Sequence, residues 1–426
     1  MRIPFVFAIV VLTAASRAFA QAPPEHVHEH EHPAMSDQAA APSPTLDPDT
    51  MGAMLAMDPG EKWMVMLHGF VFLTFNRQSG PSGGEDFESQ NHLMTAALHR
   101  LWGGKLSFFG TFSLEPATIP RAGAYELFQR GETYNGILLV DRQHPHDFFT
   151  ELAAQWERPV SDRLKLRLYL APVGEPALGP IAYPHRLSAS AMPQAPLSHH
   201  NQDSTHITYD VITAAADAGA VELEGSVFHG AEPDENRWNI QSGGLDSYSG
   251  RLTLRPARDL EVQLSAGHLE NPEAIEPGNQ TRYVGAAYYQ RATPGGYLAV
   301  SLVSGLNETN DGREWGSLAE ATWKFGGANF VFGRAEAVDR DLYELTHKTQ
   351  RPDGVPHVRT RVWAGTLGLA RDFAFIPKVE TSVGASATLF HFTSRLDGVY
   401  DSMPFGFQAF LRIVFGSAEH AGHHSH

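Results

Sequence analysis

Between about residues 61 and 416, the chain alternates apolar and polar positions in runs of about ten residues. In RLKLRLYL at 163–170, four leucines alternate with Arg163, Lys165, Arg167 and Tyr169. Successive side chains of a strand point to opposite faces, so one face of this segment is apolar and the other is mostly charged. Charged side chains at every second position do not suit a packed protein core. They suit a water-filled lumen surrounded by a lipid-facing apolar surface.

The same alternation recurs along the chain and predicts 16 strands. Their approximate ranges are 63–77, 89–101, 104–114, 148–158, 163–172, 205–217, 219–229, 246–256, 259–270, 280–291, 296–305, 316–325, 328–338, 358–371, 376–391 and 405–415.

Short and long connections between these strands alternate. Short turns include WGG, PVSD, PAR and TPG, while longer segments lie near 78–88, 115–147, 173–204, 230–245, 271–279, 306–315, 339–357 and 392–404. Outer-membrane barrels have even strand numbers, short periplasmic turns and long external loops. We therefore predict an all-β fold: a transmembrane, antiparallel, up-and-down β-barrel of about 16 strands, within a range of 14–18. The alternative is a soluble β-sandwich or lipocalin-like binder, which does not account for the charged inner faces.

The last predicted strand, FGFQAFLRIVF at 405–415, places apolar side chains at every second position and ends on Phe415. This ending resembles the C-terminal strand of bacterial outer-membrane barrels. On the opposite, charged faces, the alternation predicts a set of lumen-lining side chains. These are Arg163, Lys165, Arg167, Glu222, Glu224, Arg251, Arg255, Glu261 and Arg412.

The ends of the chain differ in composition from the barrel. Residues 1–20 have a positive start, a short apolar stretch and Ala18-Phe19-Ala20, the pattern of a secretory signal peptide. Residues 21–60 form a periplasmic arm rich in His, Pro and Ala without strand or helix periodicity, so we predict that it is disordered. The barrel follows over 61–416, with a histidine-rich tail at 417–426. The predicted location is the outer membrane of a Gram-negative bacterium.

Composition restricts the chemistry. The chain has no cysteine, which excludes disulfides, thiol nucleophiles and thiolate metal sites. Its formal net charge of −16 makes nucleic acid an unsuitable partner and favours cations. Outer-membrane lipid and small solutes or metal cations are the expected partners.

Histidines concentrate in both end segments: His26, His28, His30 and His32 lie in the arm, and four more lie in the C-terminal tail. Alternating imidazole and carboxylate groups suit Zn, Cu or Ni ions. We hypothesise that these arms capture copper or zinc in the periplasm, with periplasmic metal-handling proteins as partners. The alternative is that they are solvated tails of biased composition.

Two loop segments suggest a second metal site. In DRQHPHDF at 141–148, Pro145 favours an extended conformation of His144, so His144 and His146 point the same way and could reach one ion. Asp141 and Asp147 would serve as ligands or as partners of the ligands. The loop SHHNQDSTH at 198–206 supplies similar groups; these are His199, His200, Asp203 and His206. The competing interpretation is that these side chains hydrogen-bond to one another and hold the loops inside the barrel.

Catalysis is a further alternative. Ser204 and His206 lie two residues apart beside Asn201 and Asp203, loosely resembling the serine, histidine and asparagine of outer-membrane phospholipase A. That family has 12 strands and a different order of these residues. A nucleophilic serine also needs a positioned base and an oxyanion hole, which the sequence does not show. We therefore do not expect an enzyme, and the hydrolase using Ser204 and His206 remains an alternative.

The loop sequences LLVDRQHPHD and HHNQDSTHI, with the histidine-rich arms, resemble a family of porin-like bacterial outer-membrane β-barrel proteins. The resemblance covers about Trp63 to Phe415. It implies a barrel in the outer membrane, and the arms suggest copper or zinc handling. The expected function is a channel or binding protein for small solutes such as transition-metal cations, with a structural barrel without transport as the other alternative.

Overall fold

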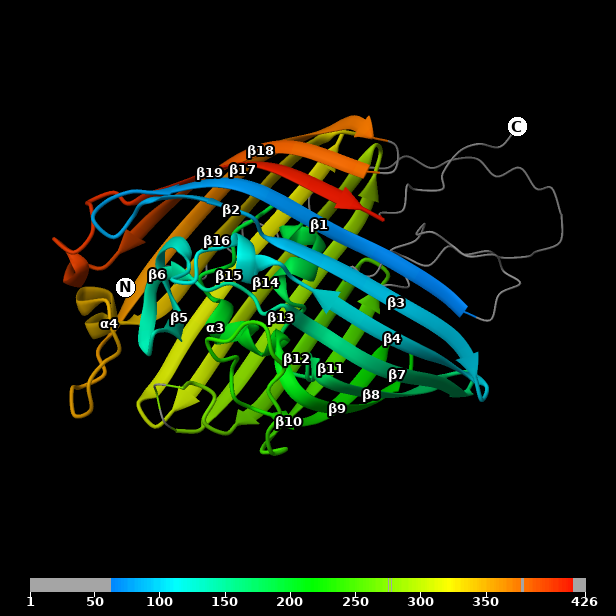
Figure 1. Ribbon diagram of the computed structural model, residues 1–426. Helices are drawn as coiled ribbons and strands as arrows, with labels where there is room; N and C mark the ends of the chain where they lie inside the picture. Colours follow the sequence, from blue (N-terminus) through cyan, green and yellow to red (C-terminus); the bar gives the residue numbers. More distant parts are fainter. Residues whose placement is uncertain (1–62, 275, 277, 377–378, 417–426) are drawn as a thin grey trace. The chain divides into compact units, whose positions relative to one another are not determined.

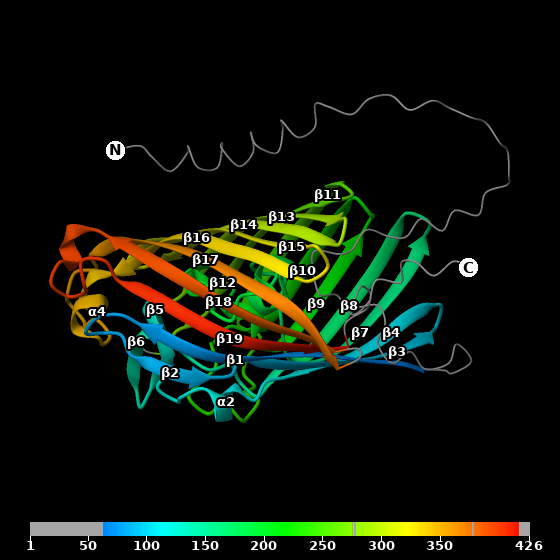
Figure 2. The same cartoon turned by 90° about the horizontal axis from the view of Figure 1, so that it is seen from above.

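The computed structural model describes residues 63–416, apart from 275, 277, 377 and 378. Its strands close into a single antiparallel barrel (Figures 1 and 2). The predicted signal peptide, the histidine-rich arm and the C-terminal tail lie outside the described residues. Within the described part of the chain, no helix is both long and apolar enough to cross a membrane.

The barrel strands follow the predicted ranges closely. They are β1 (Trp63–Gln78), β2 (Glu85–Glu88), β3 (Asn91–Leu101), β4 (Gly104–Phe112), β7 (Phe149–Ser161), β8 (Leu164–Gly174), β9 (Thr208–Asp217), β10 (Val221–His229), β11 (Ser247–Ala257), β12 (Leu260–Leu269), β13 (Gln280–Thr293), β14 (Gly296–Thr309), β15 (Gly312–Phe325), β16 (Asn329–Asp341), β17 (Arg359–Ile376), β18 (Val379–Phe392) and β19 (Phe405–Phe415).

Hydrogen bonding between the first and last strands closes the sheet. β1 pairs with β19 from Gly69 opposite Phe415 to Gln78 opposite Gly406. β2 and β3 pair with successive stretches of β1, so the 17 strands of the sheet occupy 16 positions around the barrel. The predicted barrel of about 16 strands is confirmed. The predicted strand 89–101 corresponds to β3, and β2 precedes it at the same position in the barrel, separated from it by a break at Ser89-Gln90.

One predicted long connection is wrong. Segment 306–315 is a tight turn of two residues, Asn310 and Asp311, because β14 and β15 extend to Thr309 and from Gly312. The connection 115–147 is long as predicted, but it contains a hairpin that the sequence pattern did not reveal. Its strands, β5 (Ala124–Tyr134) and β6 (Ile137–Gln143), form a separate two-stranded sheet. In both views this hairpin lies at the same end of the barrel as α4 (Leu342–His347).

The outward face of the barrel is apolar. Leu166, Leu168 and Leu170 are 43%, 42% and 44% exposed, while Tyr169 between them is buried. On β17, Leu367 and Leu369 are more than 60% exposed. A closed barrel with an apolar outer surface and a charged interior is the architecture of outer-membrane proteins, because closure satisfies every backbone hydrogen bond within the bilayer.

Two long connections fold into the lumen, and we call them together the plug: the hairpin β5–β6 and residues 175–207. Every residue from 175 to 207 is buried or partly buried. This second segment contains η1 (Tyr183–His185), η2 (Leu187–Ala189), α3 (His199–Gln202) and η3 (Ser204–His206). Two further short elements lie elsewhere, α2 (Glu115–Thr118) after β4 and η4 (Ser394–Leu396) before β19. In Figure 1, α3 lies within the ring of strands.

Both apolar packing and ion pairs hold the plug against the barrel wall. Leu127, Phe128 and Leu197 of the plug share one buried cluster with wall residues Val338 and Val362.

Arg186 is fully buried and forms the central ionic contact of the plug. Its Nε donates to Glu320 of β15 at 2.6 Å, and its Nη1 donates to Asp203 at 3.2 Å. Arg334 of β16 also donates to Glu320, at 2.9 Å. Breaking one partner of such a buried pair is costly, because it leaves the remaining charges unpaired and away from water.

We predict that Arg186→Ala releases residues 175–207 from the wall. The substitution leaves Asp203 and Glu320 with fewer cationic partners, at a cost of roughly 3–5 kcal/mol. The expected result is a lower unfolding temperature and faster proteolysis within 175–207.

The matched control is Arg313→Ala, since Arg313 pairs with Glu308 at 2.8 Å but its side chain is 64% exposed. Exposed pairs contribute at most about 1 kcal/mol, so this variant should behave like the unaltered protein. Equal proteolysis of the two variants would contradict the role assigned to Arg186.

Candidate metal centre in the lumen

The two histidine-bearing segments meet inside the barrel. His144 and His146 follow β6, and His199, His200 and His206 lie in and after α3. All five are at most 8% exposed. The loops that carry them fold inward, so these histidines lie within the lumen.

One group of possible ligands consists of His144, His199 and His200, whose candidate ligand atoms lie within 4.8 Å of one another. The ring centroid of His144 is 6.0 Å from that of His199 and 5.4 Å from that of His200. Carboxylates hold two of these rings by Nδ1: Asp203 lies 2.7 Å from His199, and Glu132 lies 3.3 Å from His144. A carboxylate on one ring nitrogen directs the other nitrogen toward a metal in many metalloproteins.

A second group consists of His92, Glu115 and His146, under the same distance limit of 4.8 Å. Glu115 begins α2 directly after β4, and its Oε2 accepts from the His146 backbone N–H at 2.9 Å. The same oxygen lies 2.7 Å from Nδ1 of the His146 ring. His144 and His146 therefore fall in different ligand groups, rather than meeting at one ion as the extended His-Pro-His segment predicted.

His206 connects the two groups without belonging to either. Its ring lies 5.1 Å from His199 in the first group and 5.2 Å from His146 in the second. His185 extends the series, with its ring 5.9 Å from that of His92. We call the series formed by His200, His144, His199, His206, His146, His92 and His185 the histidine row.

Several nitrogens of the row have no hydrogen-bond partner among the described residues. They are Nε2 of His144, Nε2 of His206 and both ring nitrogens of His92 and His200. Burial lowers the pKa of His200 to about 4, and burial together with Arg237 lowers that of His144. Burial also tends to lower the pKa of His146, but Glu115 raises it above its ordinary value. At neutral pH, His144 and His200 are thus uncharged and able to donate a lone pair to a metal.

The three aspartates predicted as ligands or ligand partners have different roles. Asp141 accepts from the backbone of Phe128 at 2.7 Å and from Tyr400 at 2.8 Å, and it belongs to none of the candidate ligand groups among the described residues. Asp147 accepts from Tyr209 at 2.8 Å and pairs with Arg237. Both therefore hold the loops in place. Asp203 orients His199 and also pairs with Arg186, so it combines the two roles.

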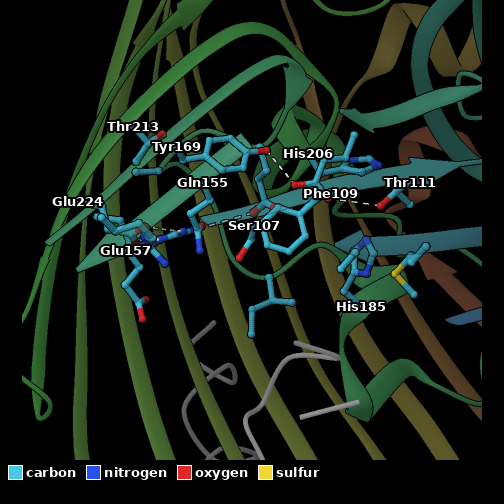
Figure 3. A pocket seen from close by; sticks show the side chains of 18 of the residues that line it. Ser107, Phe109, Thr111, Gln155, Glu157, Tyr169, His185, His206, Thr213 and Glu224 are labelled. Atoms are coloured by element: carbon cyan, nitrogen blue, oxygen red, sulfur yellow. Dashed lines mark hydrogen bonds and ion pairs between the residues drawn. The ribbon is translucent and has the colours of Figure 1, made fainter. Parts of the chain in front are cut away.

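A cavity of about 400 Å³ lies beside the row (Figure 3). His92, His185 and His206 contribute to its lining. Six predicted lumen residues line it: Arg167, Glu222, Glu224, Arg251, Arg255 and Glu261.

The three remaining predicted lumen residues lie elsewhere. Lys165 is exposed and pairs with Asp217 at 3.1 Å, and Arg412 is buried on the inner face of β19. Arg163 does not line the lumen, because β8 begins at Leu164 and leaves Arg163 in the exposed turn after β7.

Sequence reasoning missed His92, Glu115, Glu132 and His185. His92 carried a usable signal, because it shares the inward face of its strand with Met94 and Ala96. Glu115 and Glu132 carried none, since only the folding of the loops brings them to His146 and His144. The arm residues His26, His28, His30 and His32 lie outside the described residues.

The hydrolase alternative gains no geometric support. Nδ1 of His206 lies 2.7 Å from the backbone oxygen of Asp203. Neither Nε2 of His206 nor the Ser204 hydroxyl has a hydrogen-bond partner among the described residues, so the two side chains do not form the nucleophile–base pair that a hydrolase needs.

Replacing Glu115 tests how His146 is held. In Glu115→Ala, the backbone N–H of His146 and its ring lose their shared acceptor, and a buried unsatisfied donor costs about 1–3 kcal/mol. We expect a lower free energy of unfolding in denaturant titrations. Glu115→Gln keeps an acceptor oxygen and should lose less; equal losses in the two variants would contradict this role.

No protein-family model and no curated protein sequence matches the chain. Solved structures of outer-membrane proteins are similar to it in outline. OprB of Pseudomonas putida has 12% identity and a TM-score of 0.49, over 83% of this chain and 94% of that one. OmpF of Salmonella typhi has 8% identity and a TM-score of 0.49, over 83% and 98%. OmpT of Vibrio cholerae has 8% identity and a TM-score of 0.47, over 84% and 100%. The strand pairing itself shows the barrel.

Proposed function

We propose that the chain is an outer-membrane barrel that binds transition-metal cations inside its lumen and acts as a channel or binding protein for them. The observation that carries this proposal is the histidine row: seven imidazoles, most of them buried, with several ring nitrogens that lack a hydrogen-bond partner among the described residues. Buried polar groups are normally hydrogen-bonded, so such a concentration of free lone pairs is costly unless a ligand uses it.

The chemistry of the row favours zinc or copper. Imidazole and carboxylate ligands suit these ions, whereas magnesium and calcium prefer all-oxygen sites. Each group offers three protein ligands, which leaves a coordination position open for water or a further ligand. The charge of the chain agrees with a cationic solute, since its formal net charge is −16.

Metal titration tests the binding. The protein to be titrated is a full-length variant in which asparagine replaces the eight histidines of the arm and tail. Only metal sites in the barrel then remain. We expect Zn²⁺ to bind to this variant. Loss of a residue that only orients a metal ligand lowers metal affinity roughly 10–100-fold, so we expect His144→Ala, which removes a ligand itself, to lower the affinity by at least as much. The matched control is His391→Ala, because His391 is exposed on β18 and its ring packs on Trp363. Equal affinity in all three proteins would exclude a site at His144.

Bilayer recording tests the channel. We expect the purified protein to give conductance events in planar bilayers that Zn²⁺ reduces, because an ion held in the histidine row adds charge to the lumen. Absence of events over a range of voltages would exclude a channel and leave a binding protein.

A further inference from the structure

The histidine row lies between two cavities. On one side is the cavity of about 400 Å³ already described, which reaches His92, His185 and His206. On the other is a second cavity, of about 420 Å³, whose lining includes Glu132, Glu232 and Glu273. Since Glu132 lies 3.3 Å from His144, this second cavity adjoins the first ligand group. The row therefore connects two cavities through a buried part of the lumen.

A third ligand group lies at the second cavity. His200, Glu232 and Glu273 have candidate ligand atoms within 4.8 Å of one another. Nδ1 of His200 is 3.7 Å from Oε1 of Glu232, too far for a hydrogen bond. Neither carboxylate oxygen of Glu232 and neither ring nitrogen of His200 has a hydrogen-bond partner in the described structure. His200 belongs to this group and also to the group of His144 and His199.

Backbone contacts fix the position of His200. Its carbonyl oxygen accepts from Asn307 at 2.9 Å and from Arg282 at 3.2 Å. On the ring side, the Cα of Gly131 approaches so closely that a Cβ there would lie 2.0 Å from Nε2 of His200. The φ of Gly131 is +137°, a conformation that residues with a side chain rarely adopt. The shared histidine is thus held at the junction of two groups.

We infer that the histidine row is a relay that passes a divalent transition-metal cation between the two cavities by ligand exchange. This inference rests on the proposed function. The cation binds first to Glu232, Glu273 and His200, and His200 remains bound as His144 and His199 replace the two carboxylates. His206 then passes the cation to His146, Glu115 and His92, at the cavity that His206, His92 and His185 line. Each step replaces one metal–ligand bond by another, with no change of oxidation state.

The geometry supports exchange rather than permanent binding. Three protein ligands at each group leave room for an incoming ligand, and conduction needs several sites of moderate strength close together. The ring centroids of His199 and His146 each lie close to His206, at 5.1 and 5.2 Å. Because His206 belongs to none of the three groups, it contributes to transfer without being required for binding.

His206 provides the test. The full chain is reconstituted in liposomes that contain a zinc-sensitive dye, Zn²⁺ is added outside, and bound zinc is counted separately by equilibrium titration. In His206→Ala we expect zinc influx to fall at least tenfold while the number of bound zinc ions stays unchanged. The matched control, His229→Ala, removes a histidine that pairs with Asp246 at 2.8 Å outside the row, and should leave influx unchanged.

Other outcomes separate the relay from the proposed function. If the unaltered chain binds no zinc, the proposed function fails. If it binds zinc but His206→Ala has unchanged or faster influx, the relay is overturned. The relay is also overturned if the unaltered chain lets protons but no zinc into the liposomes. Should His206→Ala not fold, as judged by circular dichroism, His206→Gln gives the same test, because its amide replaces the imidazole in the same space.

Discussion

Burial of charge inside a closed barrel is the constraint on which the rest of the structure depends. Residues 175–207 bring Arg186 and Asp203 out of water, and removing charges from water is affordable only when each has close partners. Glu320 on the wall supplies the partner, at 2.6 Å from Arg186. The alternating charges of the strands therefore do more than line a channel: they fix where the plug lies. Once it is fixed, the histidines of residues 175–207 lie next to His92 on the wall and next to His144 and His146 after β6.

The same contacts hold the loops in place and orient the histidines of the candidate ligand site. Asp203 pairs with Arg186 and also lies 2.7 Å from Nδ1 of His199. The sequence presented loop attachment and metal binding as competing interpretations of the two motifs. In the structure Asp141 and Asp147 hold the loops in place, whereas His144, His199 and His200 lie close enough together to form a candidate metal-ligand group.

The barrel was predictable because its pattern is local: alternation along each strand and turn residues between strands decide the pairing. The interior of the plug was not, since its contacts join distant parts of the chain. Glu115 meets His146 across 31 residues, and Arg340 of β16 donates to Phe128 of the hairpin across 212 residues. The hairpin was also not predictable from the sequence pattern, because β5 and β6 pair irregularly, with register shifts between Tyr125 and Thr133.

The long reach of these contacts has a consequence for biogenesis. Residues 175–207 lie in the first half of the chain, yet Arg186 contacts Glu320, 134 residues further on. Such nonlocal contacts form late, because the intervening chain must first be in place. The plug therefore cannot reach its final position until β15 and β16 have joined the sheet. A partly assembled barrel would have a lumen without its candidate ligand groups, so the proposed metal binding would begin only when assembly is complete.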